Sequence, residues 1–218
     1  MNSRVILVSD DRSSLRSPDT LLWPDAACMR GIHTGEWTAH IFEYAMSFEG
    51  NMTQVRELAA ANGVGVLHPH GALATDPPGL VVCDVDSTVT RTEAIDLLAE
   101  CAGKADEVRE ITARAMVGEL DFTQSLYARV RCLEGLHIGA LEEAWKATVI
   151  TPGTAELVAA AHDVGAAVGL VSGGFTAVVD PLAEQIGADF AASNELEIVD
   201  NHLTGRVVGD IIDRAAKA

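Results

Sequence analysis

The 218-residue sequence predicts an α/β fold: a Rossmann-like parallel sheet with an inserted helical cap and a small α+β appendage at the N-terminus. Two short apolar runs, at residues 80–83 and 166–171, support the sheet, because strands buried on both faces of a parallel sheet are continuously hydrophobic. Helical patterns at residues 154–162 and 176–185 flank the second run, which is the alternation typical of parallel α/β proteins. Residues 95–147 are helix-rich and charged, so we expect them to form the cap.

The N-terminal appendage ends at a sequence that interrupts regular structure. Apolar pieces at residues 5–8 and 64–67 favour strands, and residues 53–61 favour a helix. The best boundary is Asp-Pro-Pro-Gly at 76–79, since two prolines block both a helix and a strand ladder. The role of the appendage stays open, a regulatory role included. The predicted domains are the appendage at 1–79, a core formed by 80–94 and 148–218, and the helical cap at 95–147.

Local signals predict the remaining elements. A helix is expected over residues 92–102, where apolar residues recur at helical spacing. Another is expected over 121–130, with Asp121 as its N-cap. Alternating residues at 195–208 around a central Asp-Asn pair predict a β-hairpin.

The charge balance excludes several classes of partner. There are 15 Lys and Arg against 32 Asp and Glu, a formal net charge of −17, whereas nucleic acids and anionic membrane surfaces are bound by clustered positive charge. No apolar run approaches the roughly 18 residues of a membrane span, and the N-terminus lacks the apolar core and cleavage site of a signal peptide. The four cysteines show no CxxC spacing. We therefore expect a cytoplasmic protein that acts on a small molecule and binds neither nucleic acid nor membrane, with a homodimer left open.

The candidate chemistry lies where the two predicted core strands end. Asp84 and Asp86 directly follow the first strand, and ligands of open α/β sheets bind at the carboxyl ends of strands. Ser87 and Thr88 add hydroxyl and N–H groups suited to an anion or a metal. A Ser-Gly-Gly segment at 172–174 ends the second strand, where bare backbone can approach a phosphate. An isolated Asp-x-Asp is compatible with a simple helix-capping turn, so the combination of these segments is what favours a phosphate site.

These segments carry a resemblance to a known family. DVDSTVT at 84–90 and SGGF at 172–175, with Lys217 downstream, resemble motifs one to three of the haloacid dehalogenase-like phosphohydrolases. Longer blocks between residues 78 and 218 narrow the resemblance to phosphoserine phosphatases, among them ITARAMVGELDFTQSLYARVRCLEGL and VSGGFTAVVDPLAEQIGAD. The resemblance implies a haloacid dehalogenase-like fold and Mg²⁺-dependent hydrolysis of O-phospho-L-serine to L-serine and phosphate, in serine biosynthesis.

The resemblance also implies roles for individual residues. Asp84 is the expected nucleophile, which forms an aspartyl-phosphate intermediate, and Asp86 is the expected acid and base. Both are the expected ligands of Mg²⁺, a hard ion that prefers oxygen and offsets the charge of two carboxylates beside a phosphate. The other expected contacts are Ser172, Gly173 and Lys217 for the phosphate, Glu93 for the ammonium group, Arg129 for the carboxylate, and Met116 and Phe122 in the cap-side pocket.

Several of these residues also have a purely structural interpretation. Glu93 fits a first-turn carboxylate favoured by the helix dipole, Arg129 an exposed cationic face, and Phe122 a core position. His68 and His70 flank a proline, which favours an exposed loop over a metal site.

The family's motif four is an acidic turn on a following strand that supplies a further metal carboxylate. It has no counterpart after Lys217. We therefore expect a C-terminally incomplete fold, with weakened metal binding and with the strand at 80–83 at an uncovered edge of the sheet. Two alternatives stay open: a truncated or inactive relative that binds phosphoserine or serine without turnover, and a phosphatase for another small phosphomonoester.

Overall fold

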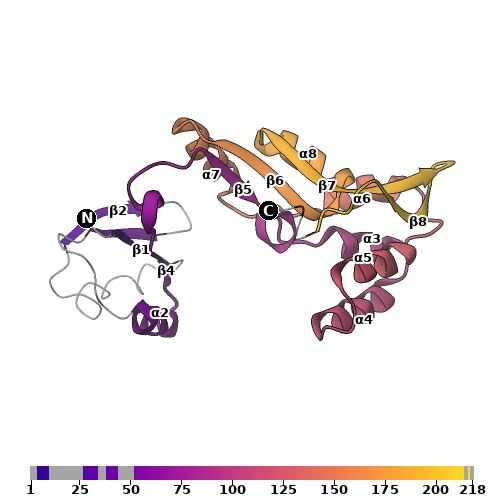
Figure 1. Ribbon diagram of the computed structural model, residues 1–218, viewed down its shortest axis with the longest axis horizontal. Helices are drawn as coiled ribbons and strands as arrows, with labels where there is room; N and C mark the ends of the chain where they lie inside the picture. Colours follow the sequence, from indigo (N-terminus) through magenta and orange to yellow (C-terminus); the bar gives the residue numbers. More distant parts are fainter. Residues whose placement is uncertain (1–3, 10–26, 34–37, 44–51, 214–215, 217–218) are drawn as a thin grey trace. The chain divides into compact units, whose positions relative to one another are not determined.

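The computed structural model describes residues 4–9, 27–33, 38–43, 52–213 and 216 (Figure 1). The chain divides into two compact units, Met1–Pro77 and Pro78–Ala218. The division falls between the two prolines of the Asp-Pro-Pro-Gly sequence, where neither a helix nor a strand ladder can continue. Within the described residues, every helix is too short or too polar to span a lipid bilayer.

The unit Met1–Pro77 is an α+β structure. Its elements are β1 (Arg4–Ser9), β2 (Ala27–His33), β3 (Thr38–Glu43), α2 (Met52–Ala61), β4 (Gly65–Leu67) and a short helical turn at Gly71–Ala74. The strands form an antiparallel sheet in the order β2-β3-β1-β4. In β1, the buried Val5 and Leu7 alternate with the half-buried Ile6 and Val8, which is the two-residue period of a strand. The strands and the helix predicted for these stretches are confirmed.

The unit Pro78–Ala218 is built on a second sheet. Its strands are β5 (Leu80–Cys83), β6 (Ala167–Phe175), β7 (Phe190–Val199) and β8 (His202–Val208). Strands β5, β6 and β7 run parallel, and β8 returns antiparallel to β7, in the order β5-β6-β7-β8. The parallel strands confirm the predicted α/β class. Asp200 and Asn201 both have positive φ and form the two-residue turn between β7 and β8, so the predicted hairpin is confirmed as well.

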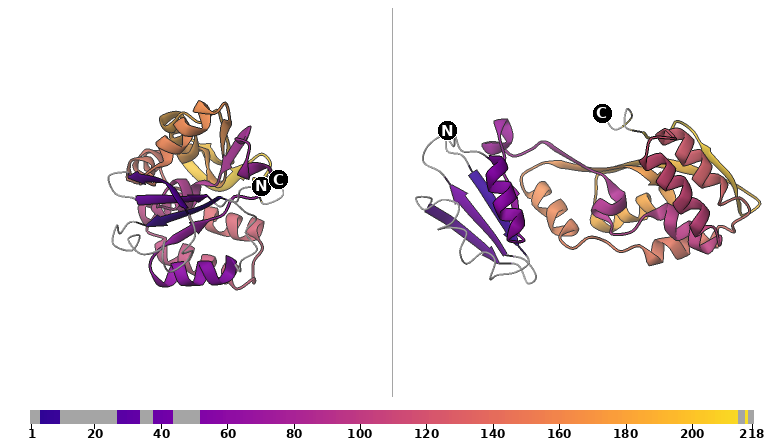
Figure 2. Two further views of the ribbon diagram at one scale, coloured as in Figure 1. Left: turned by 90° about the vertical axis from the view of Figure 1, so that its left-hand side faces the viewer. Right: turned by 90° about the horizontal axis from the view of Figure 1, so that it is seen from below.

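Helices connect and cover these strands (Figure 2). After β5 the chain makes a turn at Val85–Val89 and continues through α3 (Ala94–Cys101), α4 (Ala105–Met116), α5 (Phe122–Arg131), α6 (Gly139–Ala147), α7 (Thr154–Asp163), β6 and α8 (Thr176–Ile186). Helices α4 and α5 lie side by side. Helices α3 to α6 fall within or next to the stretch predicted as the helical cap.

Two hydrophobic clusters hold this unit together. One joins helices α3 to α6 with Phe175 at the end of β6 and with Leu196 and Leu203 of the hairpin. The other lies between the sheet and helices α7 and α8, where Val168 and Leu170 of β6 are fully buried. Because the first cluster includes residues of β6 and of the hairpin, it fixes helices α3 to α6 against the carboxyl end of β6.

Strand β5 differs from one of the expectations. The prediction that residues 80–83 are buried on both faces was wrong, since Leu80 is 53% and Val82 48% exposed. The expectation of an edge strand was right, because β5 ends the sheet formed by the described residues. Within those residues, α7 and α8 cover the face that carries Val81 and Cys83. A short apolar run therefore does not distinguish a central strand from an edge strand.

Candidate active site

A pocket of about 200 Å³ opens at the carboxyl ends of β5 and β6. Its walls come from the turn after β5, the start of α3, helix α5 and the end of β6. The lining residues are Asp84, Asp86, Glu93, Ile95, Phe122, Leu126, Arg129, Gly173, Gly174 and Phe175. This is the edge of an open α/β sheet at which ligands bind, because strand ends and helix N-termini present backbone groups there.

The turn after β5 directs two acidic side chains to the pocket. Val85 is 1% and Val89 6% exposed, and these two side chains anchor the turn in the core. The N–H of Thr90 closes the turn by donating to the carbonyl of Val85 at 2.9 Å. Because successive side chains of extended backbone face opposite ways, the burial of Val85 turns Asp84 and Asp86 toward the pocket.

Asp86 is held at both carboxyl oxygens. Its Oδ1 accepts a hydrogen bond from the N–H of Ala94 at 2.9 Å, at the start of α3, and its Oδ2 accepts one from Ser172 Oγ at 3.0 Å. Burial raises the pKa of Asp86, and Glu93 and Asp84 add smaller contributions in the same direction, whereas the two hydrogen bonds lower it. Because its pKa is raised on balance, the carboxyl group of Asp86 keeps its proton to a higher pH than an ordinary aspartic acid does.

The Ser-Gly-Gly end of β6 is fitted closely around Asp86. Ser172 is fully buried, and its Oγ accepts a hydrogen bond from the N–H of Gly174 at 2.8 Å while it donates to Asp86. A Cβ at Gly174 would lie 2.5 Å from Asp86 Oδ2, and a Cβ at Gly173 would lie 2.7 Å from Cζ of Phe122. Neither position has room for a side chain. The close contacts with Asp86 and Phe122 therefore favour glycine at both positions.

Helix α5 brings Arg129 to the pocket. The helix begins at a capping box: Asp121 Oδ1 accepts from the N–H of Gln124 at 2.8 Å, and Gln124 Oε1 accepts from the N–H of Asp121 at 3.0 Å. The predicted N-cap is thus confirmed. Arg129 is half-buried, and its Nε donates to the carbonyl of Ser125 at 3.3 Å. Burial lowers the pKa of Arg129, and Glu93 is the strongest of the nearby acids that oppose this change.

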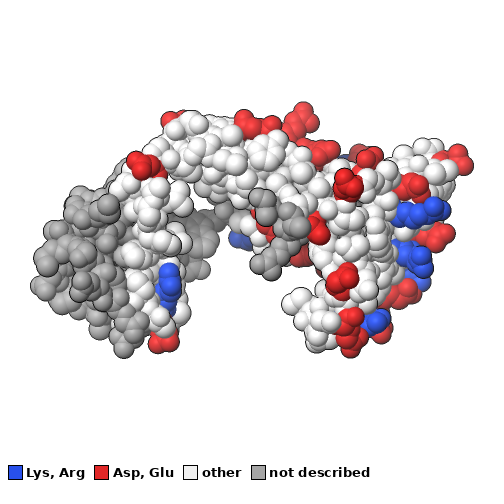
Figure 3. Space-filling view, viewed as in Figure 1, with Lys and Arg blue, Asp and Glu red and all other residues white. Residues whose placement is uncertain are grey.

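The pocket is rich in negative charge. Among the described residues that line it, Asp84, Asp86 and Glu93 are acidic and Arg129 is basic. The excess of acid extends to the visible surface of this unit, where Figure 3 shows more acidic than basic side chains. A phosphate in this pocket would therefore need further positive charge beside it.

Most of the predicted site residues meet in this pocket, and some do not. Six of them line it: Asp84, Asp86, Glu93, Phe122, Arg129 and Gly173. Ser172 does not line the pocket but donates a hydrogen bond to Asp86, which does. Met116 is 83% exposed and does not line the pocket. Lys217 lies outside the described residues. Phe122 is 41% exposed, so it does not occupy the buried core position that the structural interpretation gave it.

Asn194 on β7 is a residue beside the pocket that was not predicted from the sequence. This side chain is 1% exposed; its Nδ2 donates to the carbonyl of Gly173 and its Oδ1 accepts from the N–H of Ile212, both at 2.9 Å. It therefore joins the end of β6 to the segment after β8. The available signal was an amide residue directly before the predicted hairpin at 195–208, because a polar side chain that becomes buried needs a partner.

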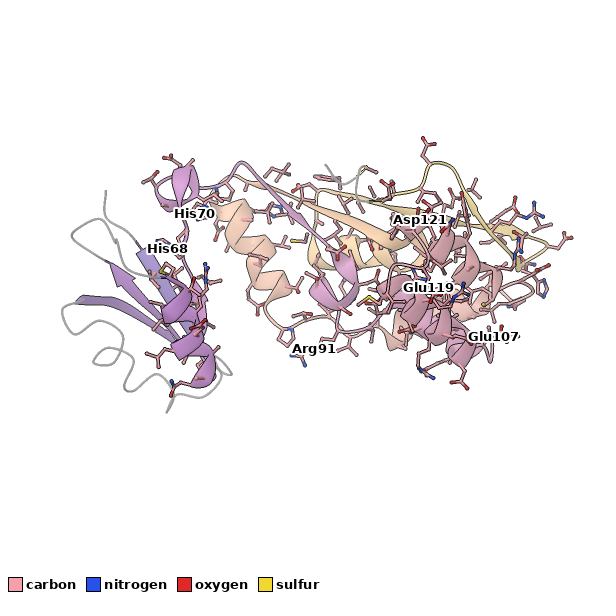
Figure 4. The ribbon with its side chains drawn as sticks, turned by 60° about the horizontal axis from the view of Figure 1, so that its bottom comes forward. His68, His70, Arg91, Glu107, Glu119 and Asp121 are labelled. Atoms are coloured by element: carbon pink, nitrogen blue, oxygen red, sulfur yellow. The ribbon has the colours of Figure 1, made fainter. Side chains whose placement is uncertain are left out.

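Several other charged and histidine side chains, labelled in Figure 4, are not among the residues that line the pocket. Glu107 pairs with Lys104 and Glu119 with Arg114, which are local pairs on and beside α4. His68 and His70 follow β4, and the Nδ1 of His70 lies 3.3 Å from the carbonyl of His68. Within the described residues, no group of three or more His, Cys, Asp or Glu is arranged to hold a metal ion.

Comparisons with known proteins agree with this geometry. Residues 81–218 match the family model of the haloacid dehalogenase-like hydrolases. A protein of Streptomyces coelicolor named phosphoserine phosphatase is 51% identical over 160 residues, which span 73% of this chain and 39% of that protein. The unliganded structure of a probable phosphoserine phosphatase from Vibrio cholerae is 32% identical with a TM-score of 0.75, over 98% of this chain and 65% of that one. The chain thus spans less than two thirds of the length of both. A structure described as a phospho-aspartyl intermediate analogue of phosphoserine phosphatase is 39% identical with a TM-score of 0.61, over 65% of this chain and 68% of that one.

Proposed function

Because the chain belongs to the haloacid dehalogenase-like hydrolase family, we propose that it hydrolyses O-phospho-L-serine to L-serine and inorganic phosphate with the help of Mg²⁺. The observation that best supports this is the meeting of Asp84 and Asp86 with the Ser-Gly-Gly end of β6, in a pocket that also contains Glu93 and Arg129. The relatives named phosphoserine phosphatase support the choice of substrate. Serine biosynthesis in the cytoplasm is the role we propose with it.

In the first step, a carboxylate oxygen of Asp84 attacks the phosphorus atom. The bond between phosphorus and the serine oxygen breaks, and Asp86 donates its proton to that oxygen. The raised pKa of Asp86 supports this assignment, because the proton stays available closer to neutral pH. L-Serine leaves, and an aspartyl-phosphate is formed at Asp84.

In the second step, a water molecule attacks the phosphorus atom of the aspartyl-phosphate. Asp86, now ionised, takes a proton from the water, and the bond between Asp84 and phosphorus breaks. Inorganic phosphate leaves. Asp84 is again a carboxylate, and Asp86 again carries its proton. The hydrogen bonds from Ala94 and Ser172 would keep Asp86 in one position through both steps.

The oxygen donors present suit a hard divalent cation. The carboxylate of Asp84 and the main-chain carbonyl of Asp86 are the protein ligands that we propose for Mg²⁺, an ion that usually keeps water and substrate phosphate oxygens as its other ligands. The excess of negative charge in the pocket supports this proposal, because it would otherwise oppose a phosphate. When bound, the ion supplies charge neutralisation between the nucleophile and the phosphoryl group.

The other end of the substrate is assigned to groups of opposite charge. We propose that Glu93 binds the ammonium group and that Arg129 binds the carboxylate, with Phe122 as an apolar wall. Ser172 and Gly173 are the proposed phosphate contacts. Lys217 and Met116 keep the roles implied by the family resemblance, in phosphate binding and in the cap-side pocket.

The test is phosphate release from O-phospho-L-serine by the 218-residue chain, with and without Mg²⁺, beside the Asp84→Asn variant. We expect turnover that depends on the metal and that the variant loses. Absence of turnover by the unaltered chain would contradict the proposal, and binding of phosphoserine measured by calorimetry would then favour the non-catalytic alternative. Faster hydrolysis of other phosphomonoesters would favour a different substrate. Arg129→Ala should raise the KM for phosphoserine about tenfold or more.

A further inference from the structure

Ser87 has a backbone conformation that residues with a side chain rarely adopt. Its φ is 57° and its ψ is 14°, in the left-handed region that favours glycine. The other described non-glycine residues with positive φ are Asp200 and Asn201, whose types tolerate this region and which form the β7–β8 turn. Glycine at position 87 would make the same turn without strain. A serine held in this conformation therefore points to a function for its side chain.

The side chain of Ser87 forms a hydrogen bond with Glu93. Its Oγ donates a hydrogen bond of 2.7 Å to Glu93 Oε1. A hydroxyl has one proton to donate, so in this arrangement Ser87 does not offer it to a bound anion, which is the role that its sequence position suggested. The bond joins the turn after β5 to the start of α3, directly beside the pocket that Glu93 lines.

Glu93 is a side chain that needs such a restraint. It is the N-cap residue of α3, but its side chain makes no capping hydrogen bond. The capping role belongs to Asp86, which accepts from the N–H of Ala94. A glutamate has several rotatable bonds, and holding it in one rotamer costs conformational entropy. The hydrogen bond from Ser87 opposes that loss and fixes the carboxylate at the pocket wall.

We propose that Ser87 is a positioning residue that sets specificity for an amino-acid substrate, because it holds the carboxylate of Glu93 where the substrate ammonium group binds. This inference rests on the proposed function, which assigns the ammonium group to Glu93. The effect is confined to one end of the substrate. A phosphomonoester without an amino group gains nothing from Glu93 and should be hydrolysed equally well without the Ser87 hydroxyl.

Two substitutions at this position separate the effect of the side-chain hydrogen bond from the effect of backbone strain. Ser87→Gly removes the hydrogen bond and relieves the backbone strain, whereas Ser87→Ala removes the hydrogen bond and keeps the strain. Both should raise the KM for phosphoserine by about three- to tenfold, the size expected for one hydrogen bond to an exposed charged group, with kcat little changed. The alanine variant should have the lower thermal midpoint of the two.

A matched substrate tests the specificity directly. The substrate 3-phosphonooxypropanoate is phosphoserine without its amino group, and its KM should be the same in the unaltered chain and in Ser87→Gly. In a Glu93→Gln background, Ser87→Gly should have no further effect on the KM for phosphoserine, because Ser87 acts through that carboxylate.

The matched control is a hydroxyl–carboxylate bond outside the pocket. Thr204 Oγ1 donates to Glu197 Oε2 on the β7–β8 hairpin, and Thr204→Val should leave both KM values unchanged. An unchanged KM for phosphoserine in Ser87→Gly, or an equal rise for both substrates, would overturn the inference while the proposed function stands. No turnover of phosphoserine by the unaltered chain would overturn the proposed function and this inference with it.

Discussion

A methyl group at position 174 would test how closely Asp86 must be placed. The Cβ of an alanine at this position lies 2.5 Å from Asp86 Oδ2 and 3.0 Å from Ser172 Oγ, whereas ordinary van der Waals contacts begin at 3.4 Å. Asp86 Oδ2 must therefore retreat by about 0.9 Å, the difference between 3.4 and 2.5 Å. The hydrogen bond between Ser172 and Asp86, 3.0 Å long, would be stretched or broken by this movement.

The expected result for Gly174→Ala is a loss of rate. A displacement of about 1 Å at a reacting group costs about 100-fold, so kcat for phosphoserine should fall by about that factor. The KM should change less, because Glu93 and Arg129 bind the other end of the substrate in the proposed function. Crowding in a well-packed site also lowers stability by about 1 to 3 kcal/mol. Steady-state phosphate release and thermal unfolding measure the two effects separately.

The control for this substitution is Gly79→Ala. A Cβ at Gly79 meets no atom within 4 Å, and that residue needs no positive φ, so both kcat and the thermal midpoint should be unchanged. If Gly174→Ala kept its kcat within about threefold of the unaltered chain, the close fit around Asp86 would not matter for the reaction.

Three further variants test other parts of the structure. Burial raises the pKa of Asp86 above its unfolded value, so its contribution to stability is present at low pH and is lost as the pH rises through the folded-state pKa. Asp86→Asn should therefore raise the thermal midpoint near neutral pH and have a shrinking effect toward about pH 4; an equal effect at both pH values would contradict this. Asn194→Leu leaves the carbonyl of Gly173 and a backbone N–H without their partner, so urea unfolding should show a loss of about 2 to 4 kcal/mol, and a loss below about 1 kcal/mol would argue against the bridge. Leu80→Lys with Val82→Thr should reduce hydrophobic dye binding and self-association without loss of stability, because both side chains are exposed on an edge strand; unchanged dye binding would mean that this face is covered.

The features that could be predicted from the sequence depend on neighbours along the chain. The β7–β8 turn follows from two residues that tolerate positive φ, and the start of α5 follows from Asp121 and the residue three positions later. The meeting of Asp84 with the Ser-Gly-Gly segment also follows from local patterns, because each segment ends a predicted strand of one parallel sheet.

The features that could not be predicted depend on residues far apart in the sequence. Ser172 and Asp86, which share a hydrogen bond, are 86 positions apart. No local pattern shows that residue 174 must lack a side chain because Asp86 lies against it. The exposure of Leu80 depends on which strands and helices surround β5, which the composition of an apolar run does not encode.

Patterns along the chain were enough to predict the α/β class, the two strand ends that carry the acidic and glycine-rich segments, and the excess of negative charge. Three hydrogen-bonded contacts became visible only in the folded chain: Ser87 donates to Glu93, Asp86 caps α3, and Asn194 joins the end of β6 to the segment after β8. Composition and spacing indicate the propensity of one segment, whereas a hydrogen-bond partner or a close contact depends on how several segments pack together.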